Sequence, residues 1–169
     1  MDTMELKKMF LDFGKTIEPS FLPDNSLKGK GVRGLAAMKR CMVPGQWQFL
    51  AVSKDRRMSQ FFVEVGLSPF EAFPIEADNL TPDHVQDGTI RFRASYLWAR
   101  RTDGWIINDQ NPMEFAVALS IEHAQKYGID DYEGVFGSLD EAFEDMKPKI
   151  IKWVLPFFDN AAKIYNLGG

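Results

Sequence analysis

Hydrophobic and polar positions recur along this chain with two different periods, helical at both ends and strand-like between them. Four large apolar residues near the N-terminus fall on one face of a helix: Leu6, Met9, Phe10 and Phe13. Asp2 precedes them as a good N-cap, and Glu5 follows three residues later, as in a capping box. We therefore expect a helix that starts at Asp2 and stops at Gly14, before Pro19.

The period then changes to two, which predicts a series of strands. The predicted strands are Ala36–Val43, Trp47–Ser53, Met58–Leu67, Thr89–Ala99 and Trp105–Ile107. In the fourth strand we expect Phe92, Tyr96 and Trp98 on the buried face. Arg91, Arg93 and Ser95 are expected on the other, polar face. The short fifth strand is expected to pair with the fourth across a turn at residues 102–104. The Pro44-Gly45 pair closes the first strand with turn chemistry.

Helical spacing returns in the last third of the chain. Asn111-Pro112 opens one predicted helix, which ends at Gly128. Ser138 caps another, with Glu141 three residues later, and the prolines at 148 and 156 are expected to break or kink the final stretch. The chain is thus predicted to be one α+β domain over residues 1–169. Its elements are an N-terminal helix, an antiparallel meander of four to five strands, and two to three C-terminal helices packed on one sheet face.

Composition fits a chain that folds on a hydrophobic core in a reducing compartment. Of its 169 residues, 45% are hydrophobic, enough to make a core without metal or disulfide support. Its one cysteine, Cys41, cannot form an intramolecular disulfide, and we expect it to be buried as a packing residue. No segment has the apolar length of a signal peptide or a membrane span, so we expect a cytoplasmic protein that does not bind membranes.

Charge is distributed unevenly around a net value of −4. Basic residues prevail before residue 58 and acidic residues after it, and residues 127–146 hold seven carboxylates without a lysine or arginine. Such a block attracts a cationic surface. We therefore expect a basic protein partner, contacted by five of these residues: Asp130, Asp131, Glu133, Glu144 and Asp145.

No set of residues has the spacing of a catalytic or metal-binding motif. His84 and His123 lie outside any metal-ligand pattern, and no cysteine pair is present, so neither a metal nor a cofactor is predicted. Residues 29–34 match G-x-G-x-x-G, but the Pro- and Asn-containing segment before them is not the buried strand that a dinucleotide site needs. The acidic balance also argues against nucleic-acid binding.

Four segments together resemble a family of small bacterial α+β domains of unknown function. They are Trp47–Ser53, Phe61–Leu67, Gly104–Ile106 and Trp153–Phe158. The resemblance implies the same order of leading helix, antiparallel meander and late helix with a Leu-Pro pair. It carries over no catalytic residue.

Two functions follow as expectations. The first is a non-enzymatic protein-binding module, of immunity or accessory type, in a bacterial cytoplasm. The alternative is a small-molecule or anion-binding protein, or an enzyme, with its pocket between the sheet and the helices. In that case Lys30, Arg91 and Arg93 are the residues expected to hold the anion.

Overall fold

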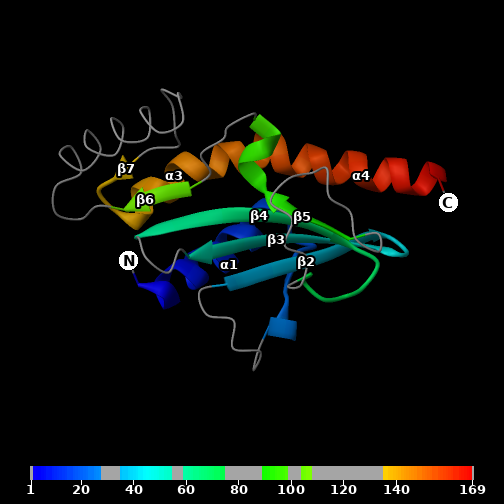
Figure 1. Ribbon diagram of the computed structural model, residues 1–169, viewed down its shortest axis with the longest axis horizontal. Helices are drawn as coiled ribbons and strands as arrows, with labels where there is room; N and C mark the ends of the chain where they lie inside the picture. The colour runs from blue at the N-terminus through cyan, green and yellow to red at the C-terminus, as the bar shows by residue number, and fades with distance from the viewer. Residues whose placement is uncertain are drawn as a thin grey trace.

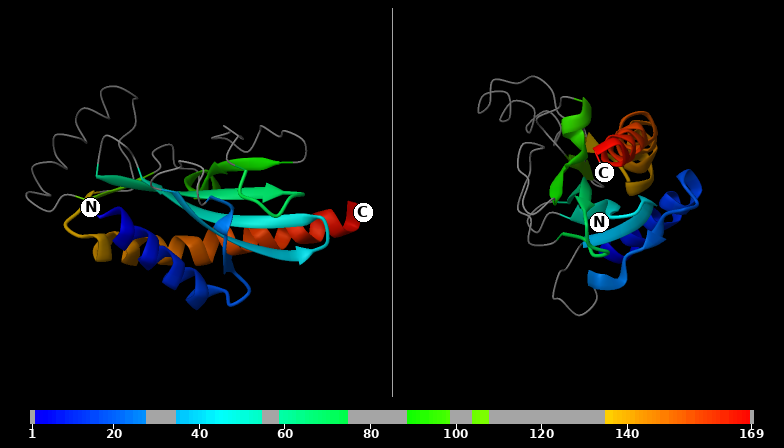
Figure 2. Two further views of the ribbon diagram at one scale, coloured as in Figure 1. Left: turned by 90° about the horizontal axis from the view of Figure 1, so that it is seen from below. Right: turned by 90° about the vertical axis from the view of Figure 1, so that its right-hand side faces the viewer.

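The computed structural model describes residues 2–27, 35–54, 59–74, 89–98, 104–107 and 135–168. These residues form an α+β fold in which one sheet carries helices on one of its faces (Figures 1 and 2). The predicted fold class is confirmed.

Seven strands form the described sheet. They are β1 (Leu22–Pro23), β2 (Leu35–Val43), β3 (Gln46–Lys54), β4 (Gln60–Ser68), β5 (Ile90–Arg93), β6 (Gly104–Ile107) and β7 (Val135–Phe136). The strand order is β1-β2-β3-β4-β6-β7, and β5 also pairs with β4. The pairings are antiparallel except that of β6 with β7, which is parallel. Gly45 in the β2–β3 turn has a φ of 87°, a left-handed conformation that glycine adopts without strain.

The far edge of β4 is shared by two strands placed end to end, and this corrects two predictions. Phe62 of β4 is the register partner of Gly104 of β6, while Glu64 is the partner of Arg93 of β5. Extending β5 by two residues would bring Ser95 opposite Phe62, where β6 already pairs. The prediction of one strand over Thr89–Ala99 is therefore wrong, as is the prediction that Trp105–Ile107 pairs with it.

Beyond Arg93 the chain continues as the 3₁₀ helix η2 (Ala94–Trp98). This change of direction separates residues that strict alternation had placed together. Phe92 is fully buried, whereas Tyr96 is 37% exposed and Trp98 is half-buried. Ser95, predicted on the polar face, is buried.

The N-terminal helix α1 spans Thr3–Ile17, and the carboxylate of Asp2 caps it by accepting the Met4 amide at 2.9 Å. The predicted stop at Gly14 is wrong, because the helix continues to Ile17. Gly14 is instead a close-packing position. A Cβ there would lie 1.8 Å from the Met38 sulfur on β2. A second short 3₁₀ helix, η1 (Asn25–Leu27), follows β1.

The C-terminal helical run consists of α3 (Leu139–Lys149), the π-helix η3 (Ile150–Val154) and α4 (Leu155–Gly168). From Met146 onward its buried residues recur at every fourth position: Met146, Ile150, Val154, Phe158 and Ala162. In a regular α-helix each step of four residues turns about 40° past a full turn, so this stripe would drift away from the sheet. The π turn, in which the Leu155 amide donates to the Ile150 carbonyl, takes in an extra residue and opposes the drift.

The prolines predicted to interrupt this run flank the π turn without ending the helix. Pro148 lies inside α3, and Pro156 is the second residue of α4, after the π turn. A proline has no amide hydrogen and its ring crowds the carbonyl four residues earlier. The wider turn before Pro156 is where a helix tolerates both effects.

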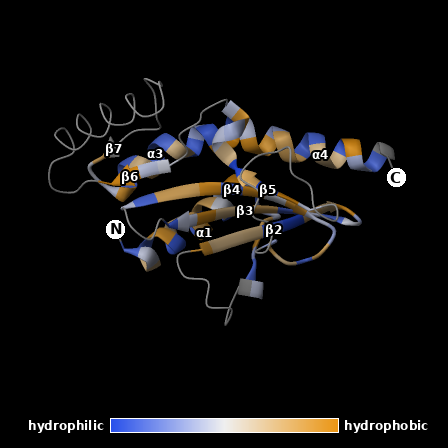
Figure 3. Cartoon of the chain, viewed as in Figure 1, coloured by the Kyte–Doolittle hydropathy of each residue, from blue (hydrophilic) through white to orange (hydrophobic). Residues whose placement is uncertain are grey.

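The two faces of the sheet are packed differently. The helix-covered face holds the main core, where Phe61 stacks on Trp105 and also contacts Phe143 of α3. The opposite face holds a smaller cluster: Leu35, Ala37, Phe49, Ala51 and Phe73. Figure 3 shows the apolar strands β3 and β4 beside a C-terminal helix on which apolar and polar residues alternate. Among the described helices, none is long and apolar enough to cross a membrane.

Candidate functional site

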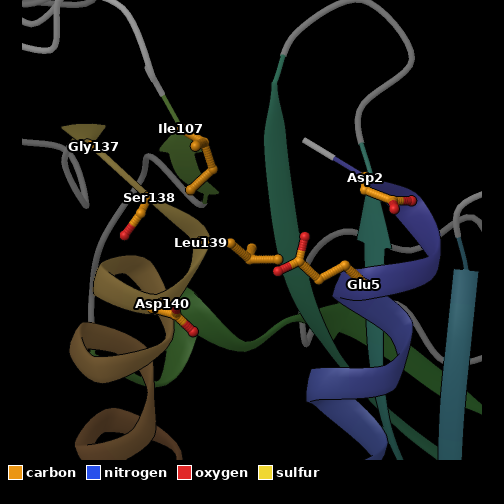
Figure 4. A pocket seen from close by; sticks show the side chains of 7 residues that line it. All are labelled: Asp2, Glu5, Ile107, Gly137, Ser138, Leu139 and Asp140. Atoms are coloured by element: carbon orange, nitrogen blue, oxygen red, sulfur yellow. The ribbon is translucent and has the colours of Figure 1, made fainter.

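A pocket of about 280 Å³ opens where the N-terminal ends of α1 and α3 meet beside β6 (Figure 4). We call it the acidic pocket, and seven residues line it: Asp2, Glu5, Ile107, Gly137, Ser138, Leu139 and Asp140. Three of the seven are carboxylates, contributed by both helices. Elements that are far apart in the sequence thus meet at one site.

Helix capping explains why the acidic residues stand at these positions. Ser138 Oγ accepts the Glu141 amide at 3.2 Å, which is the first half of the predicted capping box. Glu141 Oε2 reaches back one residue farther than in a standard box and accepts the Gly137 amide at 3.0 Å. Asp140 and Glu5 lie in the first turns of their helices, where the helix dipole stabilises a negative charge. The same residues therefore start the helices and make the pocket acidic.

The pocket keeps a net negative charge in spite of the helix ends. Each helix N-terminus carries roughly +0.5 of an elementary charge, so two of them balance only about one of the three carboxylates. In the described part of the chain, no lysine or arginine forms an ion pair with Asp2, Glu5 or Asp140. The buried side chains of Ile107 and Leu139 supply an apolar wall. This combination suits a cationic group on an aliphatic stem.

The described residues do not make the acidic pocket a metal centre. Within them, no group of three or more His, Cys, Asp or Glu side chains is arranged to hold a metal ion.

Two of the predicted binding carboxylates, Glu144 and Asp145, lie farther along α3 and are engaged within the fold. Glu144 pairs with Lys147 at 2.8 Å. Asp145 Oδ2 accepts the indole N–H of Trp105 and pairs with Lys149, both at 2.9 Å. Residues 127–146 contain no lysine, but Lys147 and Lys149 in the next turn of α3 pair with these two carboxylates.

The other three predicted binding residues, Asp130, Asp131 and Glu133, lie outside the described residues, as do Lys30, His84, His123 and the Gly29–Gly34 segment. In the sequence, Glu133 precedes the first residue of β7 by two positions. The acidic pocket itself was missed by the sequence analysis, because nothing in the sequence pairs the start of α1 with the start of α3.

Arg91 and Arg93, the predicted anion contacts, lie on the sheet face opposite the helices. Arg91 binds the buried carboxylate of Glu64 through two hydrogen bonds, Nε to Oε1 at 3.0 Å and Nη2 to Oε2 at 3.2 Å. Its guanidinium also lies over the Phe73 ring, and that of Arg93 lies over Phe62. The geometry thus does not place them between the sheet and the helices, where the alternative function needs them.

The described part of the space between sheet and helices is filled by the main core, apart from one polar cluster around Arg40 of β2. The Arg40 side chain is 3% exposed and contacts Glu18, Gln48 and Asp159. It is flanked by the rings of Phe21 and Phe158. These partners all belong to the framework of helices and strands, so we interpret the cluster as structural.

Cys41 is exposed, so the prediction of a buried packing cysteine is wrong. The β2–β3 register shifts between Arg40 and Val43, and this irregularity takes Cys41 out of the regular alternation. Its thiol donates to the Val43 carbonyl at 3.2 Å.

Comparison of the chain with protein-family models, with curated proteins and with solved structures gives no significant match. The resemblance to small bacterial domains therefore stays an expectation from the sequence.

Proposed function

We propose that this chain is a non-enzymatic protein-binding module whose acidic pocket receives a lysine or arginine side chain of a basic partner. The observation that supports the proposal is the convergence of Asp2, Glu5 and Asp140 on one pocket, with no basic partner in the described part of the chain.

The size and lining of the pocket favour a side chain over a free metabolite. Its volume of about 280 Å³ lies just below the range of roughly 300–1,000 Å³ that is usual for small-molecule sites. Lysine and arginine pack their methylene stems on apolar surface and leave the charged head among polar groups. Ile107 and Leu139 offer such a surface, and the carboxylate residues Asp2, Glu5 and Asp140 line the same pocket.

The wider charge distribution supports the same kind of partner. Nine more acidic than basic residues follow position 57, so the C-terminal two thirds of the chain attracts cationic proteins at a distance. Long-range attraction of this kind speeds encounter, and a pocket then fixes the orientation of the complex. We place the module in a bacterial cytoplasm, where an exposed thiol such as that of Cys41 stays reduced.

The test uses a short lysine-containing peptide as the probe and follows backbone amide shifts by NMR. We expect the shifts to change at Gly137–Asp140 and at the start of α1. The double variant Glu5→Gln, Asp140→Asn removes two charges and keeps both capping side chains, Asp2 and Ser138. It should weaken peptide binding about tenfold or more, since losing a close charge pair costs on the order of 1.5 kcal/mol or more.

Glu144→Gln is the matched control, because it removes one exposed carboxylate of α3 outside the pocket lining. It should leave the peptide affinity within about twofold of the wild type. The proposal is wrong if the double variant and the control bind the peptide equally, or if the shift changes centre away from both helix starts.

A further inference from the structure

We draw no further inference here: the strongest candidate, the exposed aromatic surface patch of Tyr96 on η2 and Trp153 on η3, two elements that contact each other, is an unpartnered apolar face, and nothing in the described part of the chain shows what covers it.

Discussion

Arg40 on β2 donates from Nη2 to Oδ1 of Asp159 on α4 at 3.2 Å, although the two residues are 119 positions apart in sequence. The same guanidinium reaches Glu18, at the end of α1, at 3.2 Å. Beside it, the Gln48 amide donates to the Phe158 carbonyl at 2.7 Å. One polar cluster thus holds the two covering helices and the β2–β3 hairpin together at this end of the sheet.

Replacing Arg40 should cost more stability than replacing either of its carboxylate partners. Arg40→Met keeps most of the side-chain volume but removes the donor that lies 2.8 Å from the buried Gln48 Oε1. A buried acceptor left without a hydrogen bond lowers the free energy of unfolding by about 1–3 kcal/mol. Asp159→Asn should cost under about 1 kcal/mol, because the Asp159 side chain is 54% exposed and returns to water. Urea denaturation of both variants measures the difference. Equal losses would show that the ion pair, and not the buried amide, sets the cost.

The stability of the α1 C-terminus should depend on pH through Glu18. The Ser20 hydroxyl and then the Ser20 amide donate to its carboxylate, and with the Arg40 charge they lower the pKa of Glu18 from its ordinary 4.5. A lowered folded-state pKa gives stability that is present above pH 4.5 and is lost as the pH falls through the folded value.

Ser20→Ala should therefore raise the pKa of Glu18 toward its ordinary value and lower stability at pH 7. The difference from the wild type should shrink once both proteins are protonated in acid. NMR titration of the Glu18 carboxyl carbon gives the pKa, and chemical denaturation at pH 7 and pH 3 gives the stabilities. A stability difference that is the same at both pH values would point to a cause other than the carboxylate.

Phe92 and Tyr96 are equivalent in the sequence pattern but should respond very differently to truncation. Phe92 is fully buried and meets Phe157 edge-on at 5.4 Å, so Phe92→Ala should cost about 3–5 kcal/mol. Tyr96→Ala, on the partly exposed 3₁₀ helix, should cost about 1 kcal/mol or less. Thermal and urea unfolding measure both. A small effect at Phe92 would mean that β5 does not face the core.

Gly14→Ala tests packing against helix propensity. Alanine is favoured over glycine inside a helix by about 1 kcal/mol, so propensity alone predicts stabilisation. The new Cβ, however, would overlap the Met38 sulfur at 1.8 Å and the Met38 methyl at 2.1 Å, in a fully buried site. We expect a net loss of about 1–3 kcal/mol.

Met38→Ala removes the atoms that the new methyl group meets, which makes a double-mutant cycle possible. In a Met38→Ala background, Gly14→Ala should be neutral or stabilising, so the two changes should be strongly non-additive. Additive losses of stability would indicate that the backbone conformation, and not the close contact with Met38 of β2, requires glycine at position 14.

The comparison of sequence and structure shows which signals are local. Asp2 and Ser138 were predicted as caps because a cap is formed by neighbours in the sequence, and both are confirmed. The end of β5 at Arg93 could not be predicted, since it depends on β6 occupying the same edge of β4. The π turn does have a sequence signal, which is the spacing of four between apolar residues from Met146 to Ala162. The acidic pocket has none, because its two halves are joined only by the fold.

The last prediction concerns the rate at which a partner binds. Asp130, Asp131 and Glu133 precede β7 in sequence, and no lysine or arginine lies between residues 127 and 146. If they add to the field of the acidic pocket, reversing all three to lysine should slow association with a basic partner several-fold at low salt. The melting temperature should change little, because surface charge contributes weakly to stability.

Salt and a reversal elsewhere on α3 separate this effect from general charge. The wild-type association rate should fall steeply as ionic strength rises, and that of the triple variant should fall less, since long-range attraction is what salt screens. Glu144→Lys should slow association less per charge, because Lys147 already neutralises Glu144 at 2.8 Å. Stopped-flow measurements with the same lysine-containing peptide, from low to high salt, give the salt dependence of the association rate for the wild type, the triple variant and Glu144→Lys. A wild-type rate that is insensitive both to salt and to the triple reversal would mean that these carboxylates are only a solvated face.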